Sequence, residues 1–310
     1  MTEWLRGTEH RLALIAGLSA ALLAAAVVAV VALAGGGSGD APGVRSSTAG
    51  LRVDRFDSGR AWAELKRQVA LGPRPAGSRA LRRLSERLRR ELPDGRFEPV
   101  PGHRGLRNVV GRLPGAKPAI VIAAHYDTKA LPGFVGANDG AAGTAAVLEL
   151  ARALGRTDRP PDAPELRFVL FDGEEATDDA RAFTATGLRG SRAYAAARAR
   201  EVGALILLDF IAAKELRIQR EATSDAALWR RLRRAAQSVG AASAFPSGRG
   251  SAVTDDHTPF LARGVPAIDL VQWPYRCWHK RCDDLSAVSE RSLDMTGETV
   301  LELVRTLSRT

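Results

Sequence analysis

The stretch Ile120–Gly143, Ile-Val-Ile-Ala-Ala-His-Tyr-Asp-Thr-Lys-Ala-Leu-Pro-Gly-Phe-Val-Gly-Ala-Asn-Asp-Gly-Ala-Ala-Gly, decides the fold of this chain. It starts inside an apolar run, Ala119–Ala124, whose length and composition are typical of a buried strand. His125 and Asp127 follow directly, at the position where open α/β sheets place their ligands. After a Gly-rich loop, Asp139 precedes an Ala-rich helical pattern. Asp139 is therefore either a helix N-cap or a member of a functional site.

Two more apolar runs end in acidic residues. Leu166–Phe171 is followed by Glu174 and Glu175, and Ala204–Leu208 is followed by Asp209. Strands alternate with helical patterns along the chain, which predicts an α/β fold with a mostly parallel mixed sheet and helices on both faces. We expect one edge of that sheet to gather carboxylates and imidazole.

Crowded carboxylates raise one another's pKa unless a cation lies between them. A divalent metal supplies that charge, and His, Asp and Glu donors suit zinc in a site open to water. Such ligands, sharing one carboxylate, would hold a pair of metals that catalyse hydrolysis. Of the adjacent Glu174 and Glu175, one would bind metal and the other would act as general base. The sequence contains no Gly-x-Ser-x-Gly elbow, phosphate-binding loop or His-Glu-x-x-His helix.

These residues belong to a set of segments that resembles the zinc aminopeptidases of metallopeptidase family 28 and the related glutaminyl-peptide cyclotransferases. The resemblance covers the chain from about Ala61 to its end and implies the zinc aminopeptidase-like α/β fold. In chain order the segments are Ala124–Asp127, Gly136–Gly143, Phe171–Glu175, Leu207–Asp209, Asp255–Phe260 and Trp278–His279.

The resemblance also implies a ligand set for two zinc ions. His125 and Asp209 would hold one zinc, Glu175 and His279 would hold the other, and Asp139 would bridge them.

Other roles follow from the same resemblance. Glu174 matches the general acid/base, and Asp127 matches the carboxylate that orients His125. Asp256 matches a residue near the substrate, and Trp278 is either a wall of the substrate pocket or part of the core.

The two enzyme classes of this family differ in reaction. Aminopeptidases usually use two zincs to hydrolyse the first peptide bond, whereas cyclotransferases use one zinc to close an N-terminal glutamine to pyroglutamate. Asp256–Phe260 and Trp278 favour the cyclotransferases, and Gly136–Gly143 is the form common in the peptidases. Asp269 stands where the animal cyclotransferases have His, and Ala176–Gly187 lacks the Trp that they place there.

We therefore expect a zinc aminopeptidase acting on the N-termini of peptides or proteins, in which Glu174 activates a metal-bound water. A glutaminyl-peptide cyclotransferase with one zinc is the alternative, and an inactive binding protein on the same fold is a third interpretation. His257 is either part of the site or a structural hydrogen-bonding residue.

The N-terminal region predicts a membrane anchor. Leu12–Ala34 is uncharged and almost wholly apolar, and a spanning helix needs about 20 such residues. Arg6 and Arg11 precede it and Arg45 is the nearest basic residue after it, which favours a cytoplasmic N-terminus. A cleaved signal peptide is the alternative, because residues 32–34 resemble a cleavage site.

The expected organisation follows from this anchor. Residues 1–11 are a cytoplasmic tail, 12–34 a transmembrane helix, 35–55 a flexible linker and 56–310 the catalytic domain, held outside the cytoplasm at the cell membrane.

Outside the cytoplasm, Cys277 and Cys282 are expected to form a disulfide, and two free thiols are the alternative. The net charge of +10 comes mostly from arginines in helical patterns. No recognised nucleic-acid motif accompanies them, so we expect no nucleic-acid partner.

Overall fold

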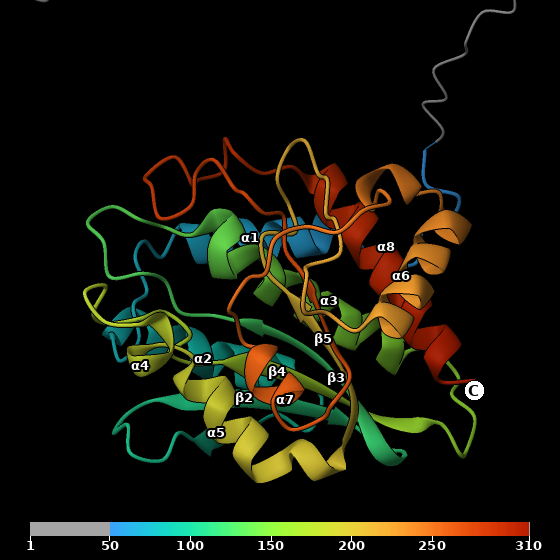
Figure 1. Cartoon of the computed structure of the whole chain (residues 1–310), viewed down its shortest axis with the longest axis horizontal. Helices are drawn as coiled ribbons and strands as arrows, with labels where there is room; N and C mark the ends of the chain where they lie inside the picture. Colours follow the sequence, from blue (N-terminus) through green and yellow to red (C-terminus); the bar gives the residue numbers. More distant parts are fainter. Residues whose placement is uncertain (1–49, 310) are drawn as a thin grey trace, which may run out of the picture. The chain divides into compact units, whose positions relative to one another are not determined.

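The computed structural model describes residues 50–309 (Figure 1). The predicted tail 1–11, the anchor 12–34 and most of the linker 35–55 lie outside these residues. Within residues 50–309, no helix has both the length and the apolar character needed to cross a bilayer. The anchor therefore stays a prediction.

A six-stranded mixed sheet forms the centre of the described chain, in the order β1-β2-β4-β3-β5-β6. Strands β4, β3, β5 and β6 run parallel, whereas β1 and β2 are antiparallel additions at one edge. The sequence-based prediction of a mostly parallel mixed sheet is confirmed. The strands are β1 Arg96–Pro99, β2 Arg107–Leu113, β3 Ala116–His125, β4 Pro164–Phe171, β5 Val202–Leu208 and β6 Ala267–Leu270.

Helices cover both faces of this sheet, as Figure 1 shows for α8 and α5 on opposite sides of the strands. The short helical turns α4 (Phe183–Thr186), α7 (Thr258–Leu261), η2 (Ala199–Glu201) and η3 (Ala242–Ala244) lie in the connections. The longer helices are α1 Ser58–Val69, α2 Arg79–Glu91, α3 Gly143–Gly155, α5 Arg189–Arg198, α6 Ala226–Val239 and α8 Glu290–Leu307.

Strand β3 is apolar on both sides because each side packs into a different core. Ile120 and Ile122 join the larger core with α1, α2, α3, α6 and α8. Val121 and Ala123 join a smaller core with α5 and α7. Side chains alternate between the faces of a strand, so a strand covered on both faces has a continuous apolar sequence.

Helix α3 begins against the end of β5, and Gly143 permits this close approach. A Cβ at Gly143 would lie 2.1 Å from the carbonyl oxygen of Leu208. The loop before α3 is therefore held against the carboxyl end of the sheet, where the candidate site lies.

Candidate active site

The carboxyl end of β3 places His125 and Asp127 in the interior. Asp127 is fully buried and accepts backbone N–H groups from Glu174 at 3.1 Å and Glu175 at 3.3 Å. Its Oδ1 also lies 3.6 Å from Nδ1 of His125. The carboxylate of Asp127 thus fixes the backbone that follows β4. The same carboxylate faces the imidazole of His125, as expected for a residue that orients His125.

Asp139 lies in an irregular segment, η1 (Ala137–Ala142), and does not cap α3. The N-cap of α3 is Ala142, so the helix-cap interpretation of Asp139 is wrong. Asp283 accepts the backbone N–H of Asn138 at 2.9 Å and that of Asp139 at 3.1 Å, which anchors the segment.

Gly140 gives this segment its close approach to β3. Its φ is +90°, and a Cβ there would lie 2.8 Å from the carbonyl oxygen of Asp127 and 3.1 Å from Cε1 of His125. A side chain at this position would push Asp139 away from the imidazole.

Two groups of ligand atoms share Asp139. In the first, Nε2 of His125 lies 3.2 Å from Oδ1 of Asp139 and 3.4 Å from Oδ1 of Asp209. In the second, Nε2 of His279 lies 3.3 Å from Oε2 of Glu175 and 3.8 Å from Oδ2 of Asp139. All five predicted ligands are therefore together, and we name these the His125 trio and the His279 trio.

The residues of both trios fit zinc. Tetrahedral zinc with bonds of about 2.0–2.2 Å sets neighbouring ligand atoms roughly 3.3–3.6 Å apart, near the spacing of these atoms. Oδ2 of Asp139 and Oε1 of Glu175 are buried without a hydrogen-bond partner in the described chain. Burial raises the pKa of both Glu175 and Asp209. A cation between these carboxylates would offset their burial and mutual repulsion.

His279 is held in place by its own short loop. Its φ is +51°, an uncommon conformation for a residue with a side chain, and its ring stacks on Trp278 at 4.5 Å between centroids. Cys277 and Cys282 on either side form a disulfide with a Cα–Cα distance of 5.4 Å. Asp283, which anchors Asp139, comes directly after Cys282, so one covalent ring connects the supports of two ligands.

Glu174 belongs to neither trio. It is buried, lines the cavity in front of the ligands, and its Oε2 lies 4.0 Å from Nδ1 of His125. Burial raises the pKa of Glu174 well above its usual value. A carboxyl group beside the ligands that is not itself among them is available for proton transfer.

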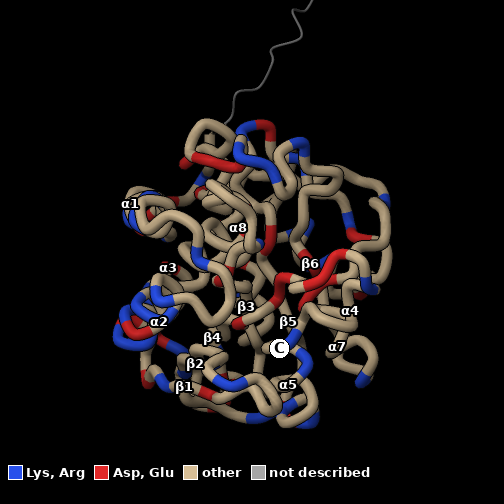
Figure 2. Tube along the Cα trace, turned by 90° about the vertical axis from the view of Figure 1, so that its left-hand side faces the viewer, with Lys and Arg blue, Asp and Glu red and all other residues tan. Residues whose placement is uncertain are grey.

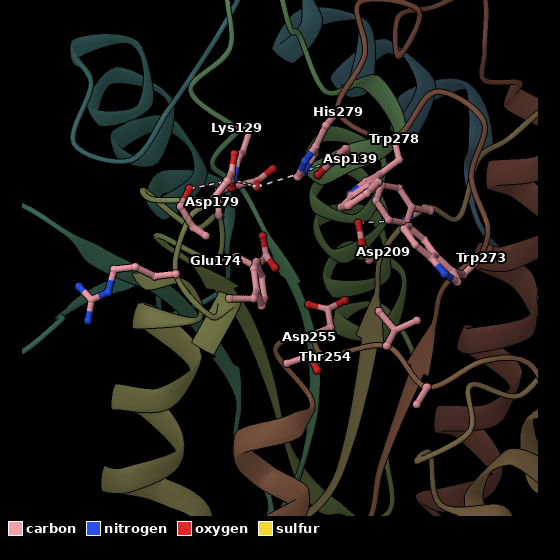
Figure 3. A pocket seen from close by; sticks show the side chains of 17 residues that line it. Lys129, Asp139, Glu174, Asp179, Asp209, Thr254, Asp255, Trp273, Trp278 and His279 are labelled. Atoms are coloured by element: carbon pink, nitrogen blue, oxygen red, sulfur yellow. Dashed lines mark hydrogen bonds and ion pairs between the residues drawn. The ribbon is translucent and has the colours of Figure 1, made fainter. Parts of the chain in front are cut away.

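The cavity has a volume of about 490 Å³ and opens over the His279 trio (Figure 3). Trp278 lines it, which favours the pocket-wall interpretation, and its side chain is 45% exposed. Other lining residues were given no role from the sequence: Lys129 and Asp255 stand inside segments quoted above, and the rest come from loops that no motif marks. They are Lys129, Asp179, Arg181, Phe183, Phe210, Ala252, Val253, Thr254, Asp255 and Trp273.

The pair Asp255-Asp256 has an arrangement that the sequence analysis did not foresee. Asp255 lines the cavity, whereas Asp256 is fully buried and is not among the lining residues. The charge of Asp256 adds to the burial that raises the pKa of Glu174, so Asp256 lies close to Glu174, and its nearness to the substrate stays a prediction. Motif matching could not separate these neighbours, because adjacent residues of a loop point in different directions.

His257 has a structural environment. It is fully buried, and its Nε2 lies 3.0 Å from the hydroxyl of Thr223 and 3.3 Å from Oε2 of Glu221. It is not among the residues that line the cavity, which supports the hydrogen-bonding interpretation.

The charges divide between the site and the outer surface. Figure 2 shows acidic segments gathered beside β5 and β6, while Lys and Arg are scattered over the outer helices and loops. The excess of arginine therefore does not form part of the ligand cluster.

Comparison with known proteins gives a consistent family. Residues 108–304 match the family described as Peptidase family M28. A glutaminyl-peptide cyclotransferase of Bothrops jararaca is 33% identical over 234 residues, which cover 62% of this chain and 63% of that protein. The chain thus matches under two thirds of the length of such curated relatives.

Solved structures resemble the described fold over most of their length. The glutaminyl cyclase of an Acidobacteriales bacterium has a TM-score of 0.72 and 29% identity, covering 87% of this chain and 99% of that one. A leucine aminopeptidase precursor of Bacteroides thetaiotaomicron has a TM-score of 0.71 and 25% identity, covering 82% of this chain and 98% of that one.

Proposed function

The chain belongs to peptidase family M28, and from this membership we propose that it is a glutaminyl-peptide cyclotransferase that converts N-terminal glutamine to pyroglutamate. The observation that carries the proposal is the likeness to the Acidobacteriales glutaminyl cyclase, which extends over nearly the whole of that protein. The cyclotransferase name of the Bothrops relative supports it. These likenesses favour the alternative above over the aminopeptidase that the sequence analysis expected.

The reaction joins the α-amino nitrogen of glutamine to its side-chain carbonyl carbon. One N–C bond forms, the bond from that carbon to the amide nitrogen breaks, and a proton passes from the amine to the departing ammonia. Glu174 is placed for this transfer, because it lines the cavity but belongs to neither trio. Its carboxylate would accept the proton of the attacking amine and return it to the leaving nitrogen.

Asp139, Glu175 and His279 would hold the zinc ion of a one-metal enzyme. Zinc supplies Lewis-acid polarisation of the side-chain carbonyl group.

The aromatic residues that line the cavity would bind the aliphatic part of the glutamine side chain. Trp278 lies against His279, and the ring of Trp273 meets that of Trp278 edge-on at 5.0 Å. Phe210 stacks on Trp273 at 6.3 Å. Phe183 also lines the cavity and brings an aromatic ring to the segment in which the sequence lacks Trp. Apolar rings leave fewer places for water beside the reacting carbonyl group.

An aminopeptidase is the second candidate, and the intact His125 trio favours it. All ligands that a second zinc would need are present and close together. The likeness to the leucine aminopeptidase precursor points the same way. The complete ligand set and Glu174 speak against the third interpretation, an inactive binding protein.

We expect a peptide beginning with Gln to lose one ammonia when incubated with the protein. Mass spectrometry should show every peptide bond intact, and ammonia should appear in equal amount. A peptide of the same sequence beginning with Ala is the control and should stay unchanged. Release of free amino acid and a shortened peptide, without ammonia loss, would replace the cyclotransferase with the aminopeptidase.

We also propose that residues 12–34 anchor the catalytic domain, residues 56–310, outside the cytoplasm. The motivating feature is the uncharged apolar run, with arginine on its N-terminal side only. The full-length chain should sediment with membranes and resist extraction by alkaline carbonate, while a chain starting at Leu51 should stay in the supernatant. A mature N-terminus at Gly35, found by N-terminal sequencing, would identify a cleaved signal peptide instead.

A further inference from the structure

Arg181 lines the cavity, and its guanidinium group has no partner among residues 50–309. The next two arginines along the chain do have partners: Arg189 donates to the carbonyl oxygen of Glu175 at 2.8 Å, and Arg192 donates to that of Thr184 at 2.7 Å. The side chain of Arg181 is exposed and has no hydrogen bond or ion pair within residues 50–309. Its charge is therefore available to a ligand.

The other cations of the cavity are already compensated. Lys129 is buried, donates to the carbonyl oxygen of Ala176 at 2.9 Å and pairs with Asp179. His279 belongs to a ligand trio. Asp178, the other acid beside Arg181, accepts the backbone N–H of Ala180 at 2.9 Å and forms no ion pair with Arg181. Arg181 is thus the uncompensated positive charge among the lining residues.

Arg181 belongs to the wall opposite the tryptophans. Figure 3 shows Lys129 and Asp179 on one side of the acidic centre and Trp278 and Trp273 on the other. Arg181 follows Asp179 by two residues and lines the same cavity, so chain continuity places it on the charged side.

The cavity is larger than one amino-acid residue needs. Its volume of about 490 Å³ is within the range of pockets that enclose whole small ligands. With the N-terminal glutamine at the His279 trio, an extended chain advances roughly 3.3–3.6 Å per residue, so its second and third residues pass between the two walls. Their side chains point to opposite sides, so one of them faces the charged wall.

The remaining lining residues would disfavour an acidic substrate. Besides the ligands, Glu174 and Asp255 bring carboxyl groups to the cavity, while Asp179 is already paired with Lys129. The unpaired guanidinium group of Arg181 would instead attract an acidic side chain close to it, because guanidinium groups bind carboxylates in a planar, two-point geometry.

We propose that Arg181 is a specificity-determining residue, which selects peptides that carry Asp or Glu at the second or third position after the N-terminal glutamine. The inference rests on the proposed function for the identity of the first residue only. The preference for an acidic neighbour comes from the cavity wall and applies to any reaction at the same centre.

The test compares matched peptides, Gln-Glu, Gln-Ala and Gln-Lys at the second position, with a second set varied at the third. At low ionic strength, kcat/KM for ammonia release should be about fivefold higher for Glu than for Lys at whichever of the two positions faces Arg181. This is the size expected when an exposed charge attracts Glu and repels Lys, each relative to Ala. Salt should reduce the ratio. Arg181→Glu should invert the Glu/Lys ratio.

Two controls isolate the charge. Arg181→Lys should keep the preference for Glu in weaker form. Arg230→Glu, at an exposed position on α6 that does not line the cavity, should leave all ratios unchanged. A Glu/Lys ratio near one in the unchanged protein, or the same ratio after Arg181→Glu, would overturn the inference.

The proposed function and this inference fail in different ways. If no Gln peptide loses ammonia but N-terminal residues are released, the cyclotransferase proposal fails. The Glu/Lys ratio is then taken from kcat/KM for release of the N-terminal amino acid, with the same peptides and variants. That ratio tests whether Arg181 selects acidic neighbours, by the same criteria.

Discussion

Glu174→Gln should reduce kcat for ammonia release by about 10²–10⁴-fold, the usual contribution of a positioned acid or base. The amide has nearly the shape of the carboxyl group but cannot carry the proton from the attacking amine to the leaving nitrogen. Glu174 belongs to neither ligand trio, so zinc content and the circular dichroism spectrum should stay those of the unchanged protein. Steady-state kinetics and elemental analysis on the same sample make the comparison.

Glu215→Gln is the matched control for this variant. Glu215 is exposed and is not among the residues that line the cavity, so its substitution should leave kcat unchanged. If Glu174→Gln kept more than a tenth of the activity, Glu174 would not be the proton carrier. If it lost zinc as well, Glu174 would be part of the metal site.

Asp139→Asn should abolish both zinc retention and activity. Asp139 is the one carboxylate common to the two trios, and its Oδ2 has no hydrogen-bond partner in the described chain. A neutral amide is a poorer zinc ligand, and the loss should exceed the roughly 10–100-fold that removal of an outer-shell partner costs in metal affinity. Zinc is measured by elemental analysis after dialysis against a chelator, with circular dichroism to show that the variant is folded.

Two further variants make the Asp139 result specific. Asp158→Asn, at an exposed position outside the site, should keep its zinc. Asp209 belongs to the His125 trio only, so Asp209→Asn should retain the single zinc of a cyclotransferase. Two zincs in the unchanged protein, falling to one in Asp209→Asn, would favour the aminopeptidase. Full zinc retention by Asp139→Asn would contradict the assignment of Asp139 as a ligand.

The sequence by itself predicted the sheet and the residues of the site. The apolar runs of β3, β4 and β5 are local patterns, because a strand buried on both faces is apolar along its length. Since parallel strands end at the same edge, the polar residues that follow them were expected to meet there. His125 and Asp209 do meet in one trio and Glu175 lies in the other, whereas the choice of Glu175 over Glu174 as the ligand came from the family resemblance.

The tertiary structure decided what surrounds that cluster. The sequence allowed Asp139 to be either a helix cap or a site residue. The structure shows that it is shared by the two trios, because Gly140 and Asp283 hold its backbone against β3. Which of Asp255 and Asp256 reaches the cavity depends on the direction of a loop, and Arg181 lines the cavity only because of the way its loop folds. Strand patterns depend on neighbours along the chain, whereas a cavity wall is assembled from loops distant in sequence, whose directions are set by packing that no local pattern records.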